Sequence, residues 1–472
     1  MRRLLAVLSA AVAAVVAAVV TLLLVGGSES RPGGPSFVVI VTDDQRWDTL
    51  SALPSVRRLL AAHGVTFENA AVVNSLCCPS RASILTGQYS HSHGVYRNKG
   101  RFGGFKAFED ESTVATWLDD AGYETALVGK YLNRYGGTYV PPGWDRWVAF
   151  SGPEPGPRPS PYFGYTLNTD GELRSHGQAA GDYSTDVLAR EAVSFVREAS
   201  DPFFLYFVPS APHSPATPPP RYEARFHDLP PHRPPSYDEP DVSDKPAWVR
   251  GLPPLTGGER AQLDELRRDQ LRSLLAVDDA VRGIVEALEE TGRLRDTFIL
   301  FTSDNGQSWG EHRWRNKSTA YEEDIRVPFV VRYDRLLAAA RADDRLVANI
   351  DIAPTVAALA GVEADDPDGR SLLPLLSGEE ASWRDVLLVE HLQSVPRQDP
   401  VPTYCAVRTE RLSYTAYVTG EEELYDLTAD PFQLTNAVDD PALGDRLLEL
   451  RSQVARLCRP TPPGSGADWL PR

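Results

Sequence analysis

Two pairs of oxygen-bearing side chains follow apolar runs of the sequence. Asp43 and Asp44 end the run SFVVIVTDD, and Asp304 and Asn305 lie near the end of DTFILFTSDNG. Carboxylate and amide oxygens are the ligands that hard cations such as Ca²⁺ or Mg²⁺ prefer. A single Asp-Asp pair after a strand is more often a helix cap or a turn. Two such pairs in one chain favour a metal site formed by these four residues.

A second motif that could do chemistry is CCPSRAS, which begins at Cys77 and leads into a helical run. At a helix N-terminus, backbone N–H groups attract an anion, and Arg81, one turn further on, can add a bidentate contact to an oxyanion. The same setting favours a thiolate nucleophile at Cys77. Thiol phosphatases, however, use a longer loop between cysteine and arginine and need no divalent metal. The alternative is that Cys77 and Cys78 are two buried structural cysteines.

Strands and helices alternate along most of the chain, and the strands decide where these residues meet. The expected strands are SFVVIVTDD (36–44), YETALVGK (123–130), PFFLYFVPSAPH (202–213) and DTFILFTSDNG (296–306), with helical stretches such as 271–292 between them. This alternation is typical of an α/β fold with a large, mainly parallel sheet flanked by helices. Ligands of such sheets bind beyond the carboxyl ends of the strands. Those ends carry the four metal candidates together with Lys130 and His213, so we expect all six in one crevice.

Two proline-rich segments, 151–161 and 214–240, interrupt the alternation. Prolines at that density exclude a helix interior or a central strand, so both segments are expected to form surface loops. The second begins directly after His213 and either rims the site or is an inert decoration. After residue 370, short amphipathic pieces predict two or three antiparallel strands and a turn. The expected division is a signal peptide or anchor with linker (1–35), a catalytic domain (36–370) and a smaller C-terminal α+β domain (371–472).

The N-terminal region combines Arg2 and Arg3 with an uncharged apolar run from Leu4 to Val25. That run is long enough to span a bilayer, for which ~20 residues suffice, and the arginines favour a cytoplasmic N-terminus. A cleaved signal peptide is the competing interpretation. Both predict that the rest of the chain is extracytoplasmic, either secreted or membrane-anchored.

Outside the cytoplasm, cysteines tend to form disulfides. Cys405 and Cys458, both in the C-terminal part, are the expected disulfide. A loop of about fifty residues closed in this way stabilises by roughly 4 kcal/mol in the chain-entropy model. The alternative is that both are buried thiols.

Several motifs resemble those of the sulfatase family, which belongs to the alkaline phosphatase superfamily. CCPSR fits the sulfatase signature C-x-P-x-R, and CCPSRASILTG followed by HSHGV is similar to the glucosamine-6-sulfatase and heparan endosulfatase branch. The resemblance continues through TDDQ, GKYLN, APHSP and SDNG, with Lys317 downstream, and ends in ELYDLTADPFQLTN. It covers nearly all of the chain after residue 35.

The resemblance implies a modified cysteine and a bound metal. In that family a formylglycine-generating enzyme oxidises the first cysteine of the signature co-translationally to formylglycine, which would be Cys77. Cys78 matches the second cysteine of the branch and is expected to pack. Family members hold Ca²⁺, with Mg²⁺ as a possible substitute. The implied metal ligands are Asp43, Asp44, Cys77, Asp304 and Asn305.

The implied reaction is hydrolysis of a sulfate monoester. One hydroxyl of the formylglycine hydrate attacks sulfur while Ca²⁺ and cationic side chains neutralise charge on the sulfuryl oxygens. These cationic side chains are Arg81, Lys130, His213 and Lys317. His213 is the candidate for protonating the leaving alcohol, with Lys317 as the alternative. The remaining hydroxyl then expels sulfate, which regenerates the aldehyde.

Three further residues are candidates for contacts with the substrate. Asn133 is a candidate sulfate contact, with a cap or turn as the alternative. Glu311 and His312 are expected to flank the site and to contact the sugar.

We therefore expect an exported sulfatase that acts on the 6-O-sulfate of a glucosamine-type sugar or a related sulfated glycan or small sulfate ester. The alternatives are a phosphate or phosphonate monoester hydrolase on the same fold and a non-catalytic surface protein that binds sulfated glycans. The formal charge of −17 disfavours nucleic acid and anionic membrane surfaces as partners. It also predicts action on short or terminal sugars, because a long polyanion would be repelled outside the pocket.

Overall fold

The computed structural model describes residues 34–152, 160–379, 382–394 and 399–471. The predicted signal peptide or anchor falls on residues 1–33, outside the described residues, and remains a prediction. Among the helices that are described, none is both long and apolar enough to cross a membrane.

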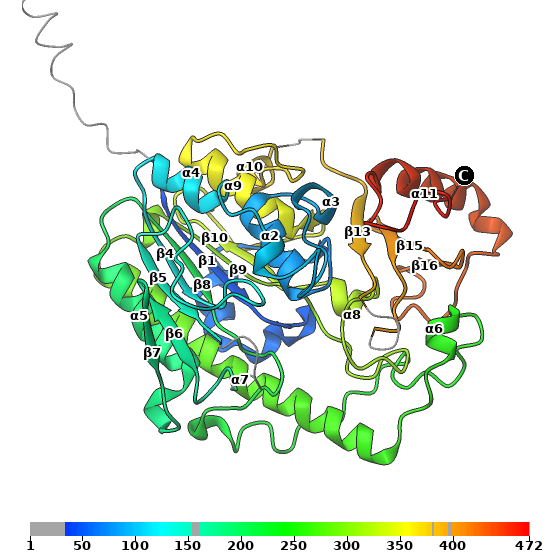
Figure 1. The fold of residues 1–472 in the computed structure, drawn as a ribbon, viewed down its shortest axis with the longest axis horizontal. Helices are drawn as coiled ribbons and strands as arrows, with labels where there is room; N and C mark the ends of the chain where they lie inside the picture. Colours follow the sequence, from blue (N-terminus) through cyan, green and yellow to red (C-terminus); the bar gives the residue numbers. More distant parts are fainter. Residues whose placement is uncertain (1–33, 153–159, 380–381, 395–398, 472) are drawn as a thin grey trace, which may run out of the picture.

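A ten-stranded sheet forms the centre of the larger part of the molecule (Figure 1). In spatial order its strands are β11 (Arg341–Asp343), β2 (Val65–Phe67), β10 (Phe329–Arg332), β9 (Thr297–Ser303), β1 (Ser36–Thr42), β8 (Phe203–Val208), β4 (Glu124–Gly129), β5 (Arg146–Phe150), β6 (Thr166–Thr169) and β7 (Glu172–Ser175). The five strands from β9 to β5 are parallel, whereas β10 and β6 run antiparallel to their neighbours β9 and β5. The mainly parallel α/β sheet predicted from the sequence is therefore confirmed.

Helices cover both faces of this sheet. Successive side chains of β1 point to opposite faces, and those on both faces are buried. Phe37, Val39 and Val41 pack into one hydrophobic cluster, and Val38 and Ile40 into the cluster on the other face. Strands buried on both faces read as continuous apolar runs, which is what the sequence of β1 shows. The first face is covered by α2 (Cys77–Thr86), α4 (Val114–Asp120), α9 (Ile352–Ala360) and α10 (Leu373–Ser377), and the second by α5 (Ser184–Glu198) and α7 (Gly257–Glu290) (Figure 1).

A separate antiparallel sheet forms the C-terminal part. Its strands are β13 (Leu387–His391), β14 (Tyr404–Arg408), β15 (Leu412–Tyr417) and β16 (Glu422–Asp426), with α11 (Gly444–Leu457) packed against it. Shorter elements complete the described fold: β3 (Ala70–Ala71), β12 (Val347–Ala348), α3 (Ser90–His93), α6 (Ala247–Arg250) and α8 (Glu322–Ile325). The domain boundary at residue 370 stays a prediction, although the core of the large sheet extends to Leu376 in α10.

The second proline-rich segment and the residues after it connect the two parts. The backbone N–H of His312 donates to the carbonyl of Ser236 at 2.7 Å, so the segment lies along the stretch that leads to Lys317. Further on, Asp244 accepts a hydrogen bond from the backbone N–H of Asn436 at 2.7 Å, in the C-terminal part. The segment therefore contacts the stretch before Lys317, and the residues that follow it contact the C-terminal part.

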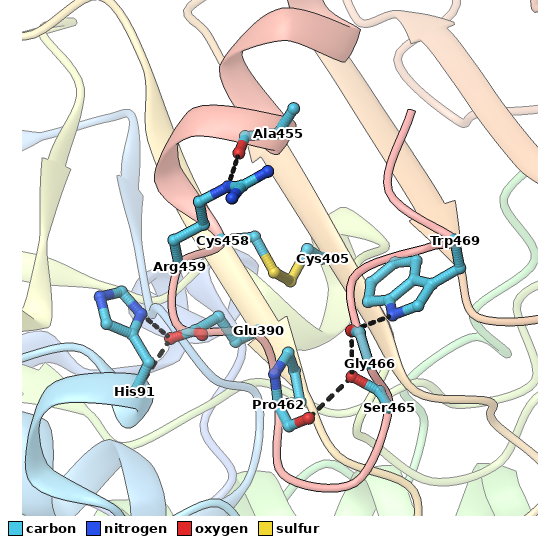
Figure 2. Close-up of a disulfide and its surroundings, with 10 residues drawn as sticks. All are labelled: His91, Glu390, Cys405, Ala455, Cys458, Arg459, Pro462, Ser465, Gly466 and Trp469. Atoms are coloured by element: carbon cyan, nitrogen blue, oxygen red, sulfur yellow. Dashed lines mark hydrogen bonds and ion pairs between the residues drawn. A yellow bond between two sulfur atoms is a disulfide. The ribbon is translucent and has the colours of Figure 1, made fainter. Parts of the chain in front are cut away.

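A disulfide joins Cys405 in β14 to Cys458 at the end of α11 (Figure 2). This is the pair expected from the sequence, and it lies in the hydrophobic cluster between the small sheet and α11. Beside it, Glu390 of β13 forms an ion pair with His91 of α3 at 3.0 Å (Figure 2). That ion pair links the small sheet to the helix that follows α2 in the chain.

Candidate active site

The spatial order of the central strands brings the candidate residues together at the carboxyl ends of these strands. β1 lies between β8 and β9, and β4 is the other neighbour of β8. Because these strands are parallel, the residues that follow them meet beyond the same edge. They are Asp43 and Asp44 after β1, Lys130 after β4, His213 in the loop after β8, and Asp304 and Asn305 after β9.

Three carboxylates form a buried cluster at this edge. The side chains of Asp43, Asp44 and Asp304 each place an oxygen within 4.8 Å of the other two, and all three are buried. Burial and the carboxylate of Asp43 raise the pKa of Asp304 above its usual range. Carboxylates at such distances repel one another unless cations neutralise them.

One buried polar atom at this cluster lacks a partner. Asn305 donates from Nδ2 to Asp44 at 2.6 Å, but its Oδ1 is buried and accepts no hydrogen bond from any described residue. Buried polar groups are nearly always paired, so this oxygen indicates a missing partner. The donor set of carboxylate and amide oxygens suits a hard cation such as Ca²⁺ or Mg²⁺.

Cys77 occupies the first position of α2 and contacts this cluster. Its Sγ lies 3.5 Å from Asp43 Oδ1 and 2.7 Å from the Nζ of Lys317, which also forms an ion pair with Asp44. The sequence led us to consider a thiolate here, but burial raises the pKa of the Cys77 thiol to about 12 despite Lys130 and Lys317. Desolvation of the charged form therefore outweighs the two lysines, and a thiolate nucleophile is disfavoured.

Arg81 lies one turn further along α2 and is fully buried. Its Nε donates to Asp304 at 2.8 Å and its Nη1 to the carbonyl of Lys130 at 2.7 Å. The remaining Nη2 lies 3.7 Å from Asp43 and has no hydrogen-bond partner within the described part of the chain. A buried guanidinium with a free N–H is a donor for an oxyanion.

Two further cationic candidates surround the cluster. Lys130 forms an ion pair with Asp43, which holds the pKa of the lysine above its usual range although burial acts to lower it. His213 places Nδ1 2.6 Å from the carbonyl of Ser214, so Nδ1 carries the proton. Its Nε2 then faces Asp44 Oδ2 at 3.8 Å, and this nitrogen can exchange a proton with a ligand.

The remaining candidates differ in their surroundings. Asn133 borders a pocket next to Lys130. The ring of His312 stacks on Tyr321 at 4.1 Å, and its Nδ1 lies 2.7 Å from the carboxylate of Glu239. Its Nε2 is buried and has no partner among the described side chains, and His312 does not line the pocket beside Lys130.

Glu311, expected to contact the sugar, has a different role. It is fully buried, and its carboxylate binds Arg46 at 2.6 Å and His232 of the proline-rich segment at 3.3 Å. The same carboxylate accepts the backbone N–H of Trp309. Sequence reasoning missed Arg46 and His232, although Arg46 follows the Asp43-Asp44 pair by two positions and was the visible signal. This buried pair joins the loop after β1 to the segment that leads to Lys317.

Comparison with known proteins agrees with this geometry. A family model described as sulfatase matches residues 35–362, and one described as N-sulphoglucosamine sulphohydrolase, C-terminal, matches residues 310–459. The N-acetylglucosamine-6-sulfatase of Homo sapiens is 35% identical, over 90% of this chain and 86% of that protein.

Two solved structures are informative. A protein solved in complex with its substrate D-glucosamine-2-N,6-O-disulfate superposes with a TM-score of 0.79 and 26% identity, covering 90% of this chain and 97% of the other. The phosphonate monoester hydrolase of Agrobacterium radiobacter gives a TM-score of 0.68 at 24% identity, over 89% of this chain and 96% of the other, which shows a shared fold. With a sulfatase model matching most of its length, the chain belongs to the sulfatase family.

Proposed function

We propose that this sulfatase hydrolyses the 6-O-sulfate of a glucosamine-type sugar, with formylglycine at position 77 and Ca²⁺ at the carboxylate cluster. The observation that carries the proposal is the position of Cys77, whose sulfur lies between Lys317 and the carboxylates of Asp43 and Asp44. The sulfur marks where an oxidised side chain would carry its oxygens. The names of the relatives support the sugar, since they include an N-acetylglucosamine-6-sulfatase and a complex with a glucosamine disulfate.

The proposed metal ligands are Asp43, Asp44, Asp304, Asn305 and the modified side chain at position 77. The unpartnered Oδ1 of Asn305 supports this set because it needs a cation or a donor. Bound Ca²⁺ would supply positive charge beside the sulfuryl oxygens, where negative charge develops.

The cationic side chains have separate tasks in this proposal. The free Nη2 of Arg81 binds one sulfuryl oxygen, and Lys130 lies on the same side through its ion pair with Asp43. Lys317 contacts position 77 directly, so it orients and stabilises the nucleophilic oxygen there.

His213 is proposed as the general acid. Ser214 accepts the proton on its Nδ1, and its Nε2 lies 3.8 Å from Asp44 Oδ2. Burial lowers the pKa of His213 below its ordinary value, although Asp43 and Asp44 act to raise it. Protonation of the leaving alcohol from Nε2 avoids a free alkoxide. Lys317 remains the alternative acid.

The first experiment is mass spectrometry of the peptide from Leu59 to Arg81, on protein co-expressed with a formylglycine-generating enzyme. We expect an aldehyde in place of the Cys77 thiol. An active protein with unmodified Cys77 would contradict the proposal.

Substrate class is tested by kcat/KM on N-acetylglucosamine 6-sulfate, on p-nitrophenyl sulfate and on the corresponding phosphate and phosphonate esters. We expect the sulfate esters to give the highest kcat/KM. A higher kcat/KM on a phosphate or phosphonate ester would instead support the alternative, a phosphate or phosphonate monoester hydrolase.

We also propose that the catalytic part is extracytoplasmic. The Cys405–Cys458 disulfide supports this because such bonds persist in oxidising compartments. Cell fractionation with sequencing of the mature N-terminus distinguishes a cleaved signal from a retained anchor. Recovery of the enzyme in the cytoplasm would contradict both.

A further inference from the structure

A pocket of about 500 Å³ opens directly beside the catalytic cluster. Asp43, Lys130 and His213 line it and also belong to the cluster around Cys77. A ligand whose ester group is held at Cys77 can therefore extend into the pocket. The volume lies within the range of ~300–1,000 Å³ that is usual for small-molecule sites.

Aromatic and aliphatic side chains make up much of the pocket wall. They are Tyr131, Leu132, Tyr135, Phe150, Pro161 and Tyr165. Two of the tyrosine hydroxyls are already engaged with the protein. That of Tyr135 accepts from Trp147 and from Asn168, each at 2.7 Å, and that of Tyr165 donates to the carbonyl of Asp182 at 2.9 Å. These tyrosines therefore offer ring surface rather than hydroxyl groups to a ligand.

The aromatic wall is held rigidly by its own packing. Tyr131, Tyr135 and Trp147 meet edge to face, with ring centroids 5.0 to 5.6 Å apart. Phe150 and Tyr165 form a second edge-to-face pair at 5.4 Å. A pre-formed apolar wall binds an apolar group without a large ordering cost.

Polar side chains also line the pocket, among them Asn133, Arg134 and Thr166. Asn133 is 8% exposed, and its Oδ1 is buried without a hydrogen-bond partner in the described structure. Because an amide oxygen only accepts, it calls for an N–H or O–H donor next to the apolar group.

We propose that this pocket binds an uncharged apolar or aromatic aglycone of the sulfated sugar, with a ligand hydroxyl or amide N–H at Asn133. The inference rests on the proposed function and narrows its substrate class. Lys130, Arg134 and His213 also line the pocket, and Lys130 and His213 lie at the catalytic cluster. A second sulfate or a carboxylate placed against the aromatic rings would lose its hydration, which is unfavourable. The enzyme would then act on terminal 6-sulfated glucosamines joined to an uncharged neighbour.

The test measures binding, so that it does not depend on turnover. The full chain carrying Cys77→Ala is titrated calorimetrically with four ligands: the methyl and phenyl β-glycosides of N-acetylglucosamine, each with and without the 6-sulfate. We expect the phenyl glycoside to bind at least about tenfold more tightly than the methyl glycoside within each pair. Equal affinities of phenyl and methyl glycosides would overturn the proposal, as would tighter binding of a glycoside with a uronate in place of the phenyl group.

The same four ligands separate this inference from the proposed function. Loss of affinity on removing the sulfate, with the phenyl preference kept, supports both. A phenyl preference without any effect of the sulfate leaves the pocket assignment standing and contradicts the proposed function.

Two wall variants locate the effect, each in the Cys77→Ala chain. Thr166→Trp fills the pocket and Phe150→Ala removes part of its wall, because both residues line it. We expect the phenyl-to-methyl preference to fall to about one in each. The control Val193→Trp makes a similar enlargement in the separate hollow between α5 and α7 and should keep the preference. A preference that survives in both wall variants would place the aglycone elsewhere.

Discussion

The two cysteine pairs of this chain lie in opposite chemical settings. Cys405 and Cys458 come from distant positions and form a disulfide inside an apolar cluster of the small sheet. Cys77 and Cys78 are adjacent, and of the four described cysteines they are the two free thiols. Cys77 faces lysines and carboxylates at the start of α2, whereas Cys78 packs in the core of the large sheet.

This contrast shows that surroundings, rather than residue type, decide what a cysteine does. The disulfide lies beside the carboxylate of Glu390 and outside the cluster around Cys77, and it is expected to contribute to stability. Cys77 is surrounded by atoms that still need a ligand, such as Asn305 Oδ1 and Arg81 Nη2. Its neighbour Cys78 shares the same helix and the same burial but has an apolar environment.

The largest expected effect distinguishes the two adjacent cysteines. Cys77→Ala should lower kcat/KM on a sulfate ester by at least ~10⁴-fold, because removal of a covalent nucleophile has effects of this size. Cys78→Ala should keep kcat within a few-fold and lower the free energy of unfolding by about 1–2 kcal/mol through the cavity it leaves. Steady-state kinetics and urea unfolding measure both. A folded but inactive Cys78→Ala variant would contradict the assignment of Cys78 to packing alone.

The disulfide should matter for stability alone. The double substitution Cys405→Ala and Cys458→Ala opens a loop of 53 residues and should lower the free energy of unfolding by about 4 kcal/mol in the chain-entropy model. We expect kcat/KM to stay within twofold at temperatures where the variant is folded. A well-folded variant with much reduced kcat/KM would show that the small sheet also shapes the site.

Removal of bound metal should lower the free energy of unfolding by less than loss of the disulfide does. With Ca²⁺ at ~100 times its dissociation constant, its removal costs about 2.7 kcal/mol of stability. We expect a chelator to lower the unfolding temperature and to abolish turnover, and added Ca²⁺ to restore both. The Asp304→Asn variant, which lacks one of the three carboxylates, should show a much smaller change on chelation. A chelator without effect on the unmutated protein would argue against the metal site.

The smallest effect concerns the ion pair between His91 and Glu390. Burial acts to lower the pKa of His91, but Glu390 raises it above its ordinary 6.5. The stabilisation is therefore complete below pH 6.5 and is lost as the pH rises through the raised value. We expect the free energy of unfolding to fall between pH 6 and 8. Urea titrations should show this fall to be absent in His91→Gln.

The position of the site was largely predictable from the sequence. Asp43, Lys130 and Asp304 each follow an apolar run, and the rule that parallel strands present their carboxyl ends at one edge brings them together. The location of Cys77 at a helix start was equally visible in CCPSRAS. These features depend on local pattern and on a general property of α/β sheets.

Other features depend on packing between distant segments and were missed. β13 is a short, fully buried run without the alternation that marks a surface strand. The raised pKa of Cys77 arises mainly from burial, which no single motif reveals. The aromatic wall around Tyr135 requires Trp147 and Asn168, which come from neighbouring strands.

If Cys77 is oxidised as proposed, its complete burial limits the time in which the modification can occur. A modifying enzyme cannot reach this side chain once β1 and β9 have closed the edge of the sheet over it. β9 leaves the ribosome roughly 220 residues after Cys77, and at ~5–20 residues per second this delay is on the order of 10–45 s. The proposed oxidation of Cys77 would therefore have to precede folding, and slower translation between α2 and β9 should then raise the fraction of modified enzyme.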